Sequence, residues 1–369
     1  MGVRELADRI AEVAGGLGSI QLMEVCGTHT VALFRTGVKS LLPPALRLVS
    51  GPGCPVCVTP QGYIDAACEL ASRPEVLICT YGDMVRVPGR TGSLERQQAC
   101  GAAVKVVYSA RDAVRLAQKR PQCAVVFLAV GFETTAPATA AAILEADAAG
   151  LENFFVLLGH KLVVPAMLAL LSAGDVPIDG FLCPGHVSVV IGAKAYQPIV
   201  DVYRKPCVVA GFEPEQMMTG ILHLVEQVAR REARVENVYG VAVRDQGNAV
   251  ARKWMYKVLE PAPSVWRAIG TIPDSGLILR EPYRRFDALG RFGLTIGPDY
   301  DPPGCRCGEV IQGKTDPAGC PLFANECTPA KPVGPCMVSS EGTCSAWYKY
   351  GRGGASCAGH PVGKPASAG

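Results

Sequence analysis

The sequence predicts an α/β protein with two Rossmann-like parallel-sheet domains that face a cleft, followed by a small cysteine-rich domain. Short apolar runs, typical of buried strands, alternate with longer stretches in which apolar residues recur at helical spacing. The alternation starts again near residue 103, which indicates a second α/β half. Past residue 304 the apolar periodicity fades and cysteines gather. We therefore expect domains at 1–120, 121–245 and 246–369.

Composition and charge exclude several classes of protein. With 369 residues and a formal net charge of +3, the chain lacks the basic character of a nucleic-acid-binding protein. No charge-free apolar run of about 18 residues occurs, and residues 1–10 have the pattern of an amphipathic helix, so we expect neither a membrane span nor a signal peptide. The 16 cysteines accompany long α/β patterns, which indicates a cytoplasmic protein whose reduced thiols serve metal or redox chemistry.

The first predicted strand, 19–25, ends at Cys26, and His29 follows just before a helix predicted over 31–42. A spacing of three residues on the first turn of a helix places both side chains on one face. A thiolate and an imidazole placed in this way could share a metal ion. The alternative is a capping threonine beside a structural histidine.

Cys54 and Cys57 lie in a loop between a strand predicted over 46–49 and a helix predicted over 61–71. Three prolines and two glycines hold this loop open. Near a helix N-terminus the helix dipole favours a thiolate, so the pair suits redox or metal chemistry. The alternative is a pair of small, buried cysteines in a packed loop.

Further polar residues follow predicted strands along the rest of the α/β region. Ligand sites of open α/β sheets form outside the carboxyl ends of the strands, so these residues are candidates for one shared cleft. A solvated loop residue is the alternative for each of them. No glycine-rich phosphate-binding motif occurs in the right setting. The candidates are Asp83, Glu133, His160, His186 and Glu213.

The region past residue 304 has too little apolar periodicity for a core of its own, so it needs a cross-link to stabilise its fold. In a reducing compartment a metal site is the favoured cross-link, and both a zinc ion and a [4Fe–4S] cluster are held by four thiolates. The spacing matches neither a zinc ribbon nor a ferredoxin run, so both stay open, with disulfides as a third alternative. The cysteines are Cys305, Cys307, Cys320, Cys327, Cys336, Cys344 and Cys357.

Four blocks, together with the cysteine-rich tail, resemble the hydrogenase formation family HypD over essentially the whole chain. They are Cys-Gly-Thr-His-Thr at 26–30, Gly-Pro-Gly-Cys-Pro-Val-Cys at 51–57, Gly-Phe-Glu-Thr-Thr at 131–135 and Pro-Gly-His-Val-Ser at 184–188. The resemblance implies a scaffold that works with the chaperone HypC to assemble the Fe(CN)₂CO group of [NiFe] hydrogenases. It implies that cyanide arrives from the carrier HypE as a thiocyanate. It also implies a [4Fe–4S] cluster on Cys305, Cys320, Cys327 and Cys344, with Cys307 and Cys336 as competing ligands.

The resemblance also implies roles for the remaining candidates. Cys26 would bind the iron ion, with His29 as a second ligand or an acid–base group. Cys54 and Cys57 would supply electrons as a dithiol that the cluster reduces again. Glu133, Thr134, His186 and Ser188 would line the cleft and orient ligands or move protons.

Two functions of other classes compete with this one. A cluster-dependent protein disulfide reductase accounts for Cys54, Cys57 and the tail, but it leaves Cys26 and His29 unexplained. A structural zinc protein that serves only as a docking platform is the other, and it would be colourless.

Overall fold

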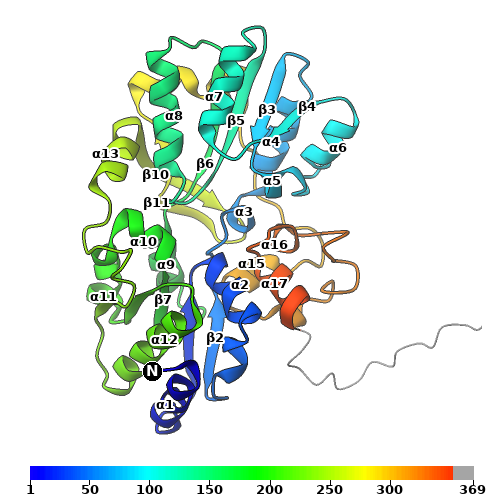
Figure 1. Ribbon diagram of the computed structural model, residues 1–369. Helices are drawn as coiled ribbons and strands as arrows, with labels where there is room; N and C mark the ends of the chain where they lie inside the picture. The colour runs from blue at the N-terminus through cyan, green and yellow to red at the C-terminus, as the bar shows by residue number, and fades with distance from the viewer. Residues whose placement is uncertain (352–369) are drawn as a thin grey trace, which may run out of the picture.

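The computed structural model describes residues 1–351. Figure 1 shows an elongated molecule with one β-sheet in its lower part and another in its upper part. The strands of both sheets are parallel, helices cover them, and a separate antiparallel ribbon follows in the sequence. The α/β class with parallel sheets and a cysteine-rich C-terminal region, predicted from the sequence, is confirmed. No helix within residues 1–351 is long and apolar enough to cross a bilayer.

The first sheet has the strand order β2-β1-β7-β8-β9. Helices α1 (Val3–Gly15) and α12 (Pro214–Ala229) cover one face of this sheet and pack against each other. Leu6, Ile10 and Ala14 recur at intervals of four, so they form one buried stripe on α1. The strands are β1 (Ile20–Glu24), β2 (Leu46–Ser50), β7 (Gly180–Pro184), β8 (Cys207–Ala210) and β9 (Val235–Asn237).

The second sheet has the strand order β4-β3-β5-β6. Its central strand β5 (Ala124–Gly131) is an almost unbroken apolar run, as expected for a strand covered on both faces. Helices α7 (Ala110–Lys119) and α8 (Ala136–Ala148) pack on this sheet, and their buried alanines allow a close approach. The other strands are β3 (Val76–Thr80), β4 (Ala103–Val106) and β6 (Phe154–His160).

Strand pairing does not follow the sequence-order halves that we expected. The chain builds β1 and β2, crosses to build the whole second sheet, and returns to complete the first sheet with β7, β8 and β9. A division at residue 120 separates β3 from its partner β5. Apolar runs reveal strands, but parallel strands are joined by long crossovers, so the runs do not reveal which strands pair.

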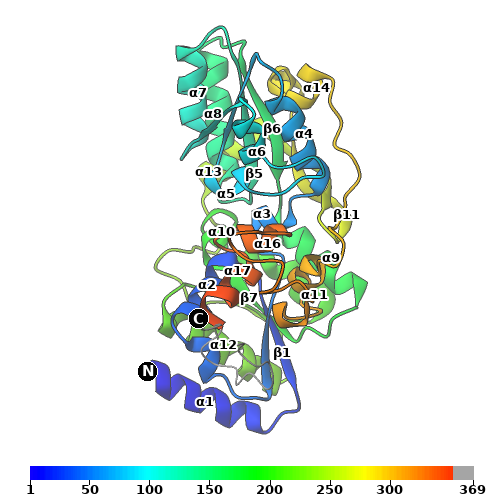
Figure 2. The same ribbon diagram turned by 90° about the vertical axis from the view of Figure 1, so that its right-hand side faces the viewer.

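The region after residue 246 packs in two places. Helix α13 (Ala249–Val258) and the ribbon of β10 (Leu259–Trp266) and β11 (Gly270–Leu279) join the core of the second sheet. The cysteine-bearing helices lie lower, beside the first sheet (Figure 2). The helices of this region that follow are α14 (Ala288–Phe292), α15 (Cys307–Ile311), α16 (Pro335–Val338) and α17 (Thr343–Tyr350).

Helices that follow strand ends occupy the middle of the molecule between the sheets. They are α2 (Gly27–Arg35) after β1, α3 (Pro55–Val58) after β2 and α5 (Gly82–Val85) after β3. The carboxyl ends of these strands therefore point toward the middle, where ligand sites of parallel sheets form. Helix α16 contacts α3, and α17 contacts α2, so the cysteine-rich region borders this place.

The remaining helices complete the cover of the sheets. They are α4 (Gln61–Ala71), α6 (Leu94–Ala99), α9 (Val163–Ala173), α10 (Gly185–Ile191) and α11 (Gln197–Tyr203), with short 3₁₀ helices at Val38–Leu41, Ala193–Tyr196, Glu281–Phe286 and Pro317–Gly319.

Candidate functional site

Cys26 is the N-cap residue of α2, so the helix begins four residues earlier than predicted. Its backbone N–H donates to the Glu24 carboxylate over 3.0 Å, which holds the turn between β1 and α2. The side chain is buried, and burial raises the pKa of the thiol to about 12. The Cys26 thiol is therefore protonated at neutral pH, and a cation that binds to it has to displace the proton.

His29 is fully buried one turn further along α2. Its Nε2 lies 2.9 Å from the carbonyl oxygen of Gly211, and a carbonyl only accepts, so Nε2 carries the proton. Burial lowers the pKa of the imidazole to about 4, so the ring is neutral. Its Nδ1 has no hydrogen-bond partner among residues 1–351, which leaves one lone pair free. This is the tautomer of a metal-ligating histidine whose other nitrogen is fixed by a carbonyl.

A Phe212 ring joins His29 to His186. The ring centroid of Phe212 lies 4.7 Å from that of His29 and 4.0 Å from that of His186. His186 lies in the first turn of α10 (Gly185–Ile191), and its side chain is exposed. The structure thus brings His186 to the His29 side of the middle region, as the sequence predicted for residues that follow β1 and β7.

Glu341 is a member of this site that the sequence did not reveal. Its carboxylate accepts from Thr28 Oγ1 over 2.7 Å, so it lies over the first turn of α2. Its charge adds to the burial that raises the pKa of Cys26, and it opposes the burial that lowers the pKa of His186. Glu341 comes from the segment between α16 and α17, more than 300 residues away in sequence, and nothing in the sequence signals that approach.

The loop that carries Cys54 is pressed against the backbone of Cys26. The backbone N–H of Gly27 donates to Gly53 O over 3.0 Å. A Cβ atom on Gly53 would lie 2.3 Å from the backbone nitrogen of Cys26, which is closer than atoms can approach. Glycine is therefore required at Gly53, and the contact brings the two thiol-bearing loops side by side.

A Gly53→Ala substitution tests this contact. We expect it to lower the free energy of unfolding by about 1–3 kcal/mol, because backbone atoms must move apart to admit the methyl group. Gly82→Ala is the matched control, since a Cβ there meets its nearest neighbour at 3.8 Å, and chemical denaturation measures both. Equal stability of the two variants would contradict the close approach.

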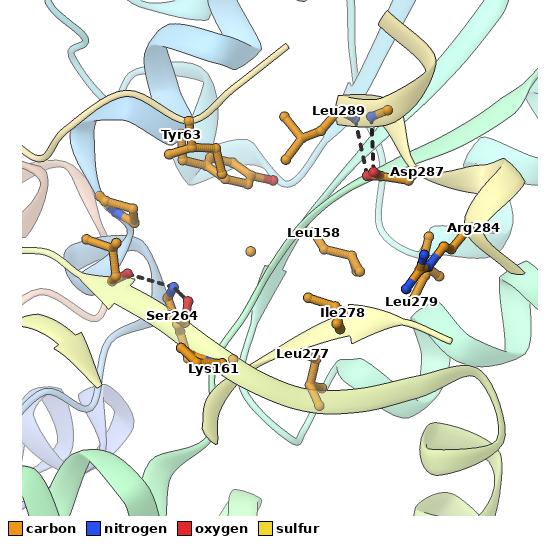
Figure 3. Close-up of a pocket in the computed structure, with 17 residues that line it drawn as sticks. Tyr63, Leu158, Lys161, Ser264, Leu277, Ile278, Leu279, Arg284, Asp287 and Leu289 are labelled. Carbon is orange, nitrogen blue, oxygen red and sulfur yellow. Dashed lines mark hydrogen bonds between the residues drawn. The ribbon is translucent and has the colours of Figure 1, made fainter. Parts of the chain in front are cut away.

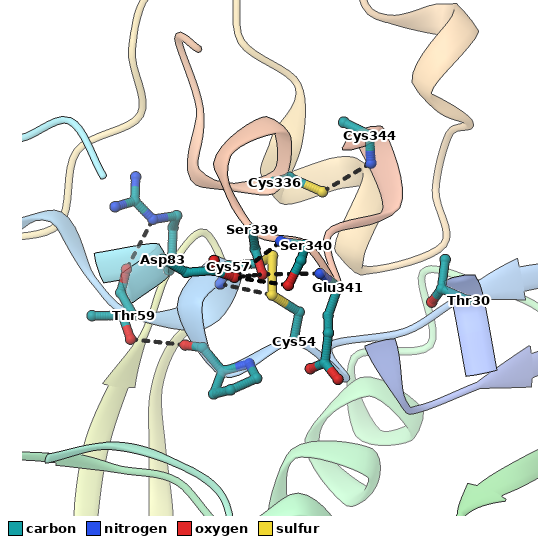
Figure 4. Close-up of a disulfide and its surroundings, with 12 residues drawn as sticks. Thr30, Cys54, Cys57, Thr59, Asp83, Cys336, Ser339, Ser340, Glu341 and Cys344 are labelled. Carbon is teal, nitrogen blue, oxygen red and sulfur yellow. Dashed lines mark hydrogen bonds between the residues drawn. A yellow bond between two sulfur atoms is a disulfide. The ribbon is translucent and has the colours of Figure 1, made fainter. Parts of the chain in front are cut away.

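Cys54 and Cys57 form a disulfide, with their Cα atoms 5.3 Å apart (Figure 4). Cys54 is the N-cap residue of the short helix α3, and its Sγ accepts from the backbone N–H of Cys57 over 3.2 Å. Both side chains are buried. The predicted strand-to-helix loop is thus present, with α3 inserted before the longer helix α4.

Asp83 anchors the segment that lies beside the disulfide. Its carboxylate accepts from Ser339 Oγ over 3.1 Å and from the N–H and hydroxyl of Ser340 over 2.9 and 3.1 Å. Since Glu341 binds α2, this segment ties α5 of the upper part to α2 of the lower part. Figure 4 shows Ser339, Ser340 and Glu341 next to the Cys54–Cys57 disulfide.

Six cysteines of the C-terminal region line one small cavity. The structure assigns none of the six to a disulfide, and no three Cys, His, Asp or Glu side chains within residues 1–351 stand in the arrangement of a metal site. Cys357, the seventh cysteine of this region, lies outside the described residues. The six are Cys305, Cys307, Cys320, Cys327, Cys336 and Cys344, so the four predicted ligands and both predicted competitors lie around the same space.

Glu133 is buried where the end of β5 meets the start of α9. Its Oε1 accepts from the backbone N–H of Val163 over 3.0 Å, while Oε2 has no partner. Burial raises the pKa of this carboxyl to about 7. The Glu133 side chain can therefore hold or release a proton near neutral pH, as an acid–base group must.

Four other candidates have environments that differ from one another. Thr134 is exposed, whereas His160 is buried with its Nε2 2.9 Å from Thr139 Oγ1. Ser188 donates to Pro184 O over 2.7 Å inside α10, and Glu213 caps α12. The Ser188 hydroxyl also lies 2.9 Å from the Tyr196 hydroxyl, and the Glu213 side chain serves as an N-cap.

The family model HypD, "Hydrogenase formation hypA family", matches residues 2–351. The chain belongs to this family. The hydrogenase expression/formation protein HupD of Azotobacter chroococcum mcd 1 is 47% identical over 95% of this chain and 94% of its own length. The hydrogenase maturation factor HypD of Escherichia coli (strain K12) is 45% identical over 94% and 95%. That of Cupriavidus necator is 48% identical over 94% and 95%. The resemblance inferred from the four blocks is confirmed.

The sulfur cavity of this HypD family member has a donor set that fits an iron–sulfur cluster. Its polar lining consists of thiols, and Leu322, Phe323 and Met337 supply apolar walls. Backbone N–H groups donate to two of the sulfurs, from Val333 to Cys327 over 3.3 Å and from Cys344 to Cys336 over 3.2 Å. Hydrogen bonds of this kind stabilise thiolates and tune the potential of a cluster. A zinc ion on four of the same thiols fits as well.

A cluster on these thiols predicts that Cys327→Ser lowers both the iron content and the melting temperature, because metal binding contributes to folding. Cys100→Ser is the control, since this cysteine is exposed at the end of α6 and is not among the cysteines that line the cavity. Iron analysis and thermal melting of anaerobically prepared protein measure the two effects. Iron content and melting equal to those of the control would mean that Cys327 is not a ligand.

Glu133→Gln is expected to raise the melting temperature more at pH 8 than at pH 5. The folded-state pKa of about 7 exceeds the ordinary value of 4.5, so the stability of the native chain falls as pH rises through 7 and the buried carboxyl ionises. Glutamine keeps the acceptor for Val163 without this loss, which is on the order of 1–3 kcal/mol. A difference between the two proteins that does not change with pH would contradict the raised pKa.

Proposed function

We propose that this chain is a cytoplasmic scaffold which, together with the chaperone HypC, holds iron and assembles the Fe(CN)₂CO group of [NiFe] hydrogenases. In this proposal the Cys54–Cys57 pair works as a dithiol, and a [4Fe–4S] cluster in a C-terminal iron–sulfur domain reduces it. Family membership supports a role in hydrogenase maturation. The roles of the individual residues rest on the arrangement of the sulfur groups.

One observation carries the proposal: the Cys54–Cys57 pair lies between the Cys26 turn and the six-cysteine cavity. On one side, Gly53 presses the loop onto the backbone of Cys26. On the other, α3 contacts α15 and α16, which contribute Cys307 and Cys336 to the cavity. A dithiol that passes electrons from a cluster to an iron-binding site has to lie between the two, as Cys54 and Cys57 do here.

The environment of Cys26 and His29 suits an iron ion that carries strong-field ligands. Both side chains are buried, so water has little access to an ion held there. Cys26 supplies a soft sulfur donor, and His29 supplies a free Nδ1 lone pair as a second donor. We infer that a cysteine of the chaperone completes the sulfur ligation.

The dithiol balances the chemistry of cyanide release. In the thiocyanate on the carrier HypE, the carbon–sulfur bond breaks, and cyanide leaves with one proton. The carrier cysteine keeps its sulfur and takes a second proton. Cys54 and Cys57 give up these two protons and two electrons, and a sulfur–sulfur bond forms between them. Each cyanide released therefore leaves one Cys54–Cys57 disulfide.

The disulfide must be reduced before the next cyanide is released. When bound in the six-cysteine cavity, a [4Fe–4S] cluster would supply electrons to this disulfide. Cys305, Cys320, Cys327 and Cys344 are the ligands we propose, and Cys307 and Cys336 are close enough to replace one of them.

Proton movement falls to groups around the first turn of α2. His186 is exposed and faces Phe212, so it can exchange protons with solvent beside the buried His29. Glu341 lies over the same turn. Glu133 has a suitable pKa but contacts α9, so we assign it a proton-holding role on the side of the second sheet.

A cluster-dependent protein disulfide reductase is the second candidate, and the Cys54–Cys57 disulfide beside a sulfur-lined cavity favours it. Such an enzyme needs no further metal ligand. It leaves the buried Cys26 thiol and the unpartnered His29 Nδ1 without a role, so we rank it below the scaffold.

A transfer assay separates the two functions. The reduced chain is mixed anaerobically with HypC, ferrous iron and HypE that carries an isotopically labelled thiocyanate. The scaffold predicts one Cys54–Cys57 disulfide for each cyanide that reaches iron. Cyanide transfer without thiol oxidation would remove the dithiol from the mechanism. Reduction of unrelated protein disulfides, with no cyanide transfer, would favour the reductase.

A further inference from the structure

A cavity of about 620 Å³ lies between β6, the β10–β11 ribbon and α14 (Figure 3). Its volume is in the range that holds small organic molecules. Pro60 and Tyr63, which follow the Cys54–Cys57 helix, form part of its wall, but none of the candidate thiols or histidines does. The sulfur chemistry proposed above makes no use of this space.

Lys161 lies at one end of the cavity beside Ser264 (Figure 3). Only 3% of the residue is exposed, so its ammonium group is removed from bulk water. The Nζ atom donates to the carbonyl oxygen of Val265 over 2.8 Å and to Ser264 Oγ. Both acceptors are uncharged, and so is the Trp266 ring, whose centroid lies 6.0 Å from Nζ, so the third N–H group of the ammonium has no charged partner.

No carboxylate within residues 1–351 forms an ion pair with Lys161. The acidic group that acts on it electrostatically is Asp299. The two oxygens of Asp299 accept instead from the backbone N–H groups of Gln61 and Ala268, each over 2.9 Å. The charge of Lys161 is thus buried without the close counter-ion that such groups normally have.

The other charged side chains of the cavity wall are already engaged. Asp287 caps α14 and accepts from the backbone N–H groups of Leu289 and Gly290 over 3.2 and 3.0 Å. Arg284 pairs with Glu281 over 2.8 Å. Lys161 is therefore the charge on this wall that lacks a charged partner.

The rest of the wall is largely apolar. Leu158 of β6 and Ile278 of β11 line the cavity from neighbouring strands, and Leu289 lines it from α14. An inorganic anion would leave this apolar surface uncovered, while an uncharged hydrocarbon would leave the ammonium unpaired. A molecule that satisfies both has one anionic head and an apolar body.

We propose that this cavity is a binding site for a small organic carboxylate, whose head pairs with Lys161 and whose apolar body lies against the leucines. Pairing supplies the missing counter-ion and the third hydrogen-bond acceptor. Burial lowers the pKa of Lys161 to about 8, so the ammonium is mostly charged at pH 7 and loses its charge above pH 8. Binding should therefore weaken as pH rises through this value.

Calorimetric titration of the full chain with sodium hexanoate tests the site, with hexanol and inorganic phosphate as comparison ligands. At pH 7 we expect hexanoate to bind at least about tenfold more tightly than hexanol, because a hydrogen bond to a charged group adds to the apolar contact. Phosphate should bind more weakly than hexanoate. Equal binding of hexanoate and hexanol, or no binding of either, would overturn the proposal.

Three variants locate the binding. Lys161→Met should lose the preference for hexanoate over hexanol, whereas Arg284→Met should keep it, since Arg284 is already paired. Ile278→Trp should fill the cavity and weaken both ligands, and the partial exposure of Ile278 allows the larger ring. If Lys161→Met lowers the melting temperature but keeps the preference, Lys161 only anchors the ribbon and the proposal fails. If Lys161→Met does not fold, unchanged binding in Ile278→Trp contradicts the proposal by itself.

Discussion

Under the proposed function, a Cys54→Ser chain should fold and bind the chaperone HypC but mature no hydrogenase above the background of cells that lack the chain. Serine is a preferred N-cap residue, and its hydroxyl can accept from the Cys57 N–H as the sulfur does now, so α3 is preserved. A single thiol cannot form the intramolecular disulfide that supplies two electrons, so cyanide release stops. Hydrogenase activity in a complemented deletion strain measures the effect.

Cys68→Ser is the matched control for this prediction. Cys68 is also buried, but it lies on α4 and lines neither the Cys26 turn nor the sulfur cavity. We expect maturation to persist in this control. Maturation that also persists in Cys54→Ser would show that the reducing step does not use this pair.

Under the proposed function, a Cys26→Ala chain should retain no iron in the middle region, whereas iron bound as a cluster in the C-terminal cavity should stay in place. The Cys26 side chain makes no capping hydrogen bond to α2, so alanine removes the thiol with little effect on the helix. The two iron pools separate because the cavity is built from other cysteines. Mössbauer spectroscopy of iron-labelled protein distinguishes the two environments.

Two outcomes of the Cys26→Ala experiment decide whether Cys26 is an iron ligand. Loss of the iron in the middle region, with the C-terminal signal unchanged, would identify Cys26 as the ligand. Loss of both signals would contradict the division between a site for iron cargo and a separate cluster. The Cys54→Ser chain is a useful reference here, since we expect it to retain both pools.

The local elements could be predicted from the sequence because each depends on residues close together. The helix predicted over 61–71 is α4, with the same bounds, because its apolar spacing and the preceding Pro60 both mark it. The strand predicted over 46–49 is β2, which extends one residue further, to Ser50. The position of Cys54 and Cys57 after that strand followed directly.

Contacts between distant segments could not be predicted in the same way. Strand β7 pairs with β1 after a crossover longer than 100 residues. No local sequence pattern signals a pairing over that separation. The hydrogen bonds from Asp83 to Ser339 and Ser340 join loops of ordinary composition. The approach of Glu341 to Thr28 is of the same kind.

The choice of cluster ligands shows the same limit inside one region. The gathering of cysteines indicated a site and the family resemblance implied four ligands, but the folding of a segment with few apolar residues places Cys307 and Cys336 around the same cavity. Both are more deeply buried than Cys305 and Cys320. Spacing alone carries no information on burial, so it could not rank the six.

Infrared spectroscopy of the protein, purified anaerobically together with its small chaperone, tests the scaffold proposal most directly. Cyanide and carbonyl ligands on iron absorb above the amide bands, where the polypeptide itself absorbs little. We expect cyanide and carbonyl bands in the native complex and their loss in the Cys26→Ala complex. An empty window in the native complex, with an intact cluster and active reduction of protein disulfides, would contradict the scaffold and favour the reductase.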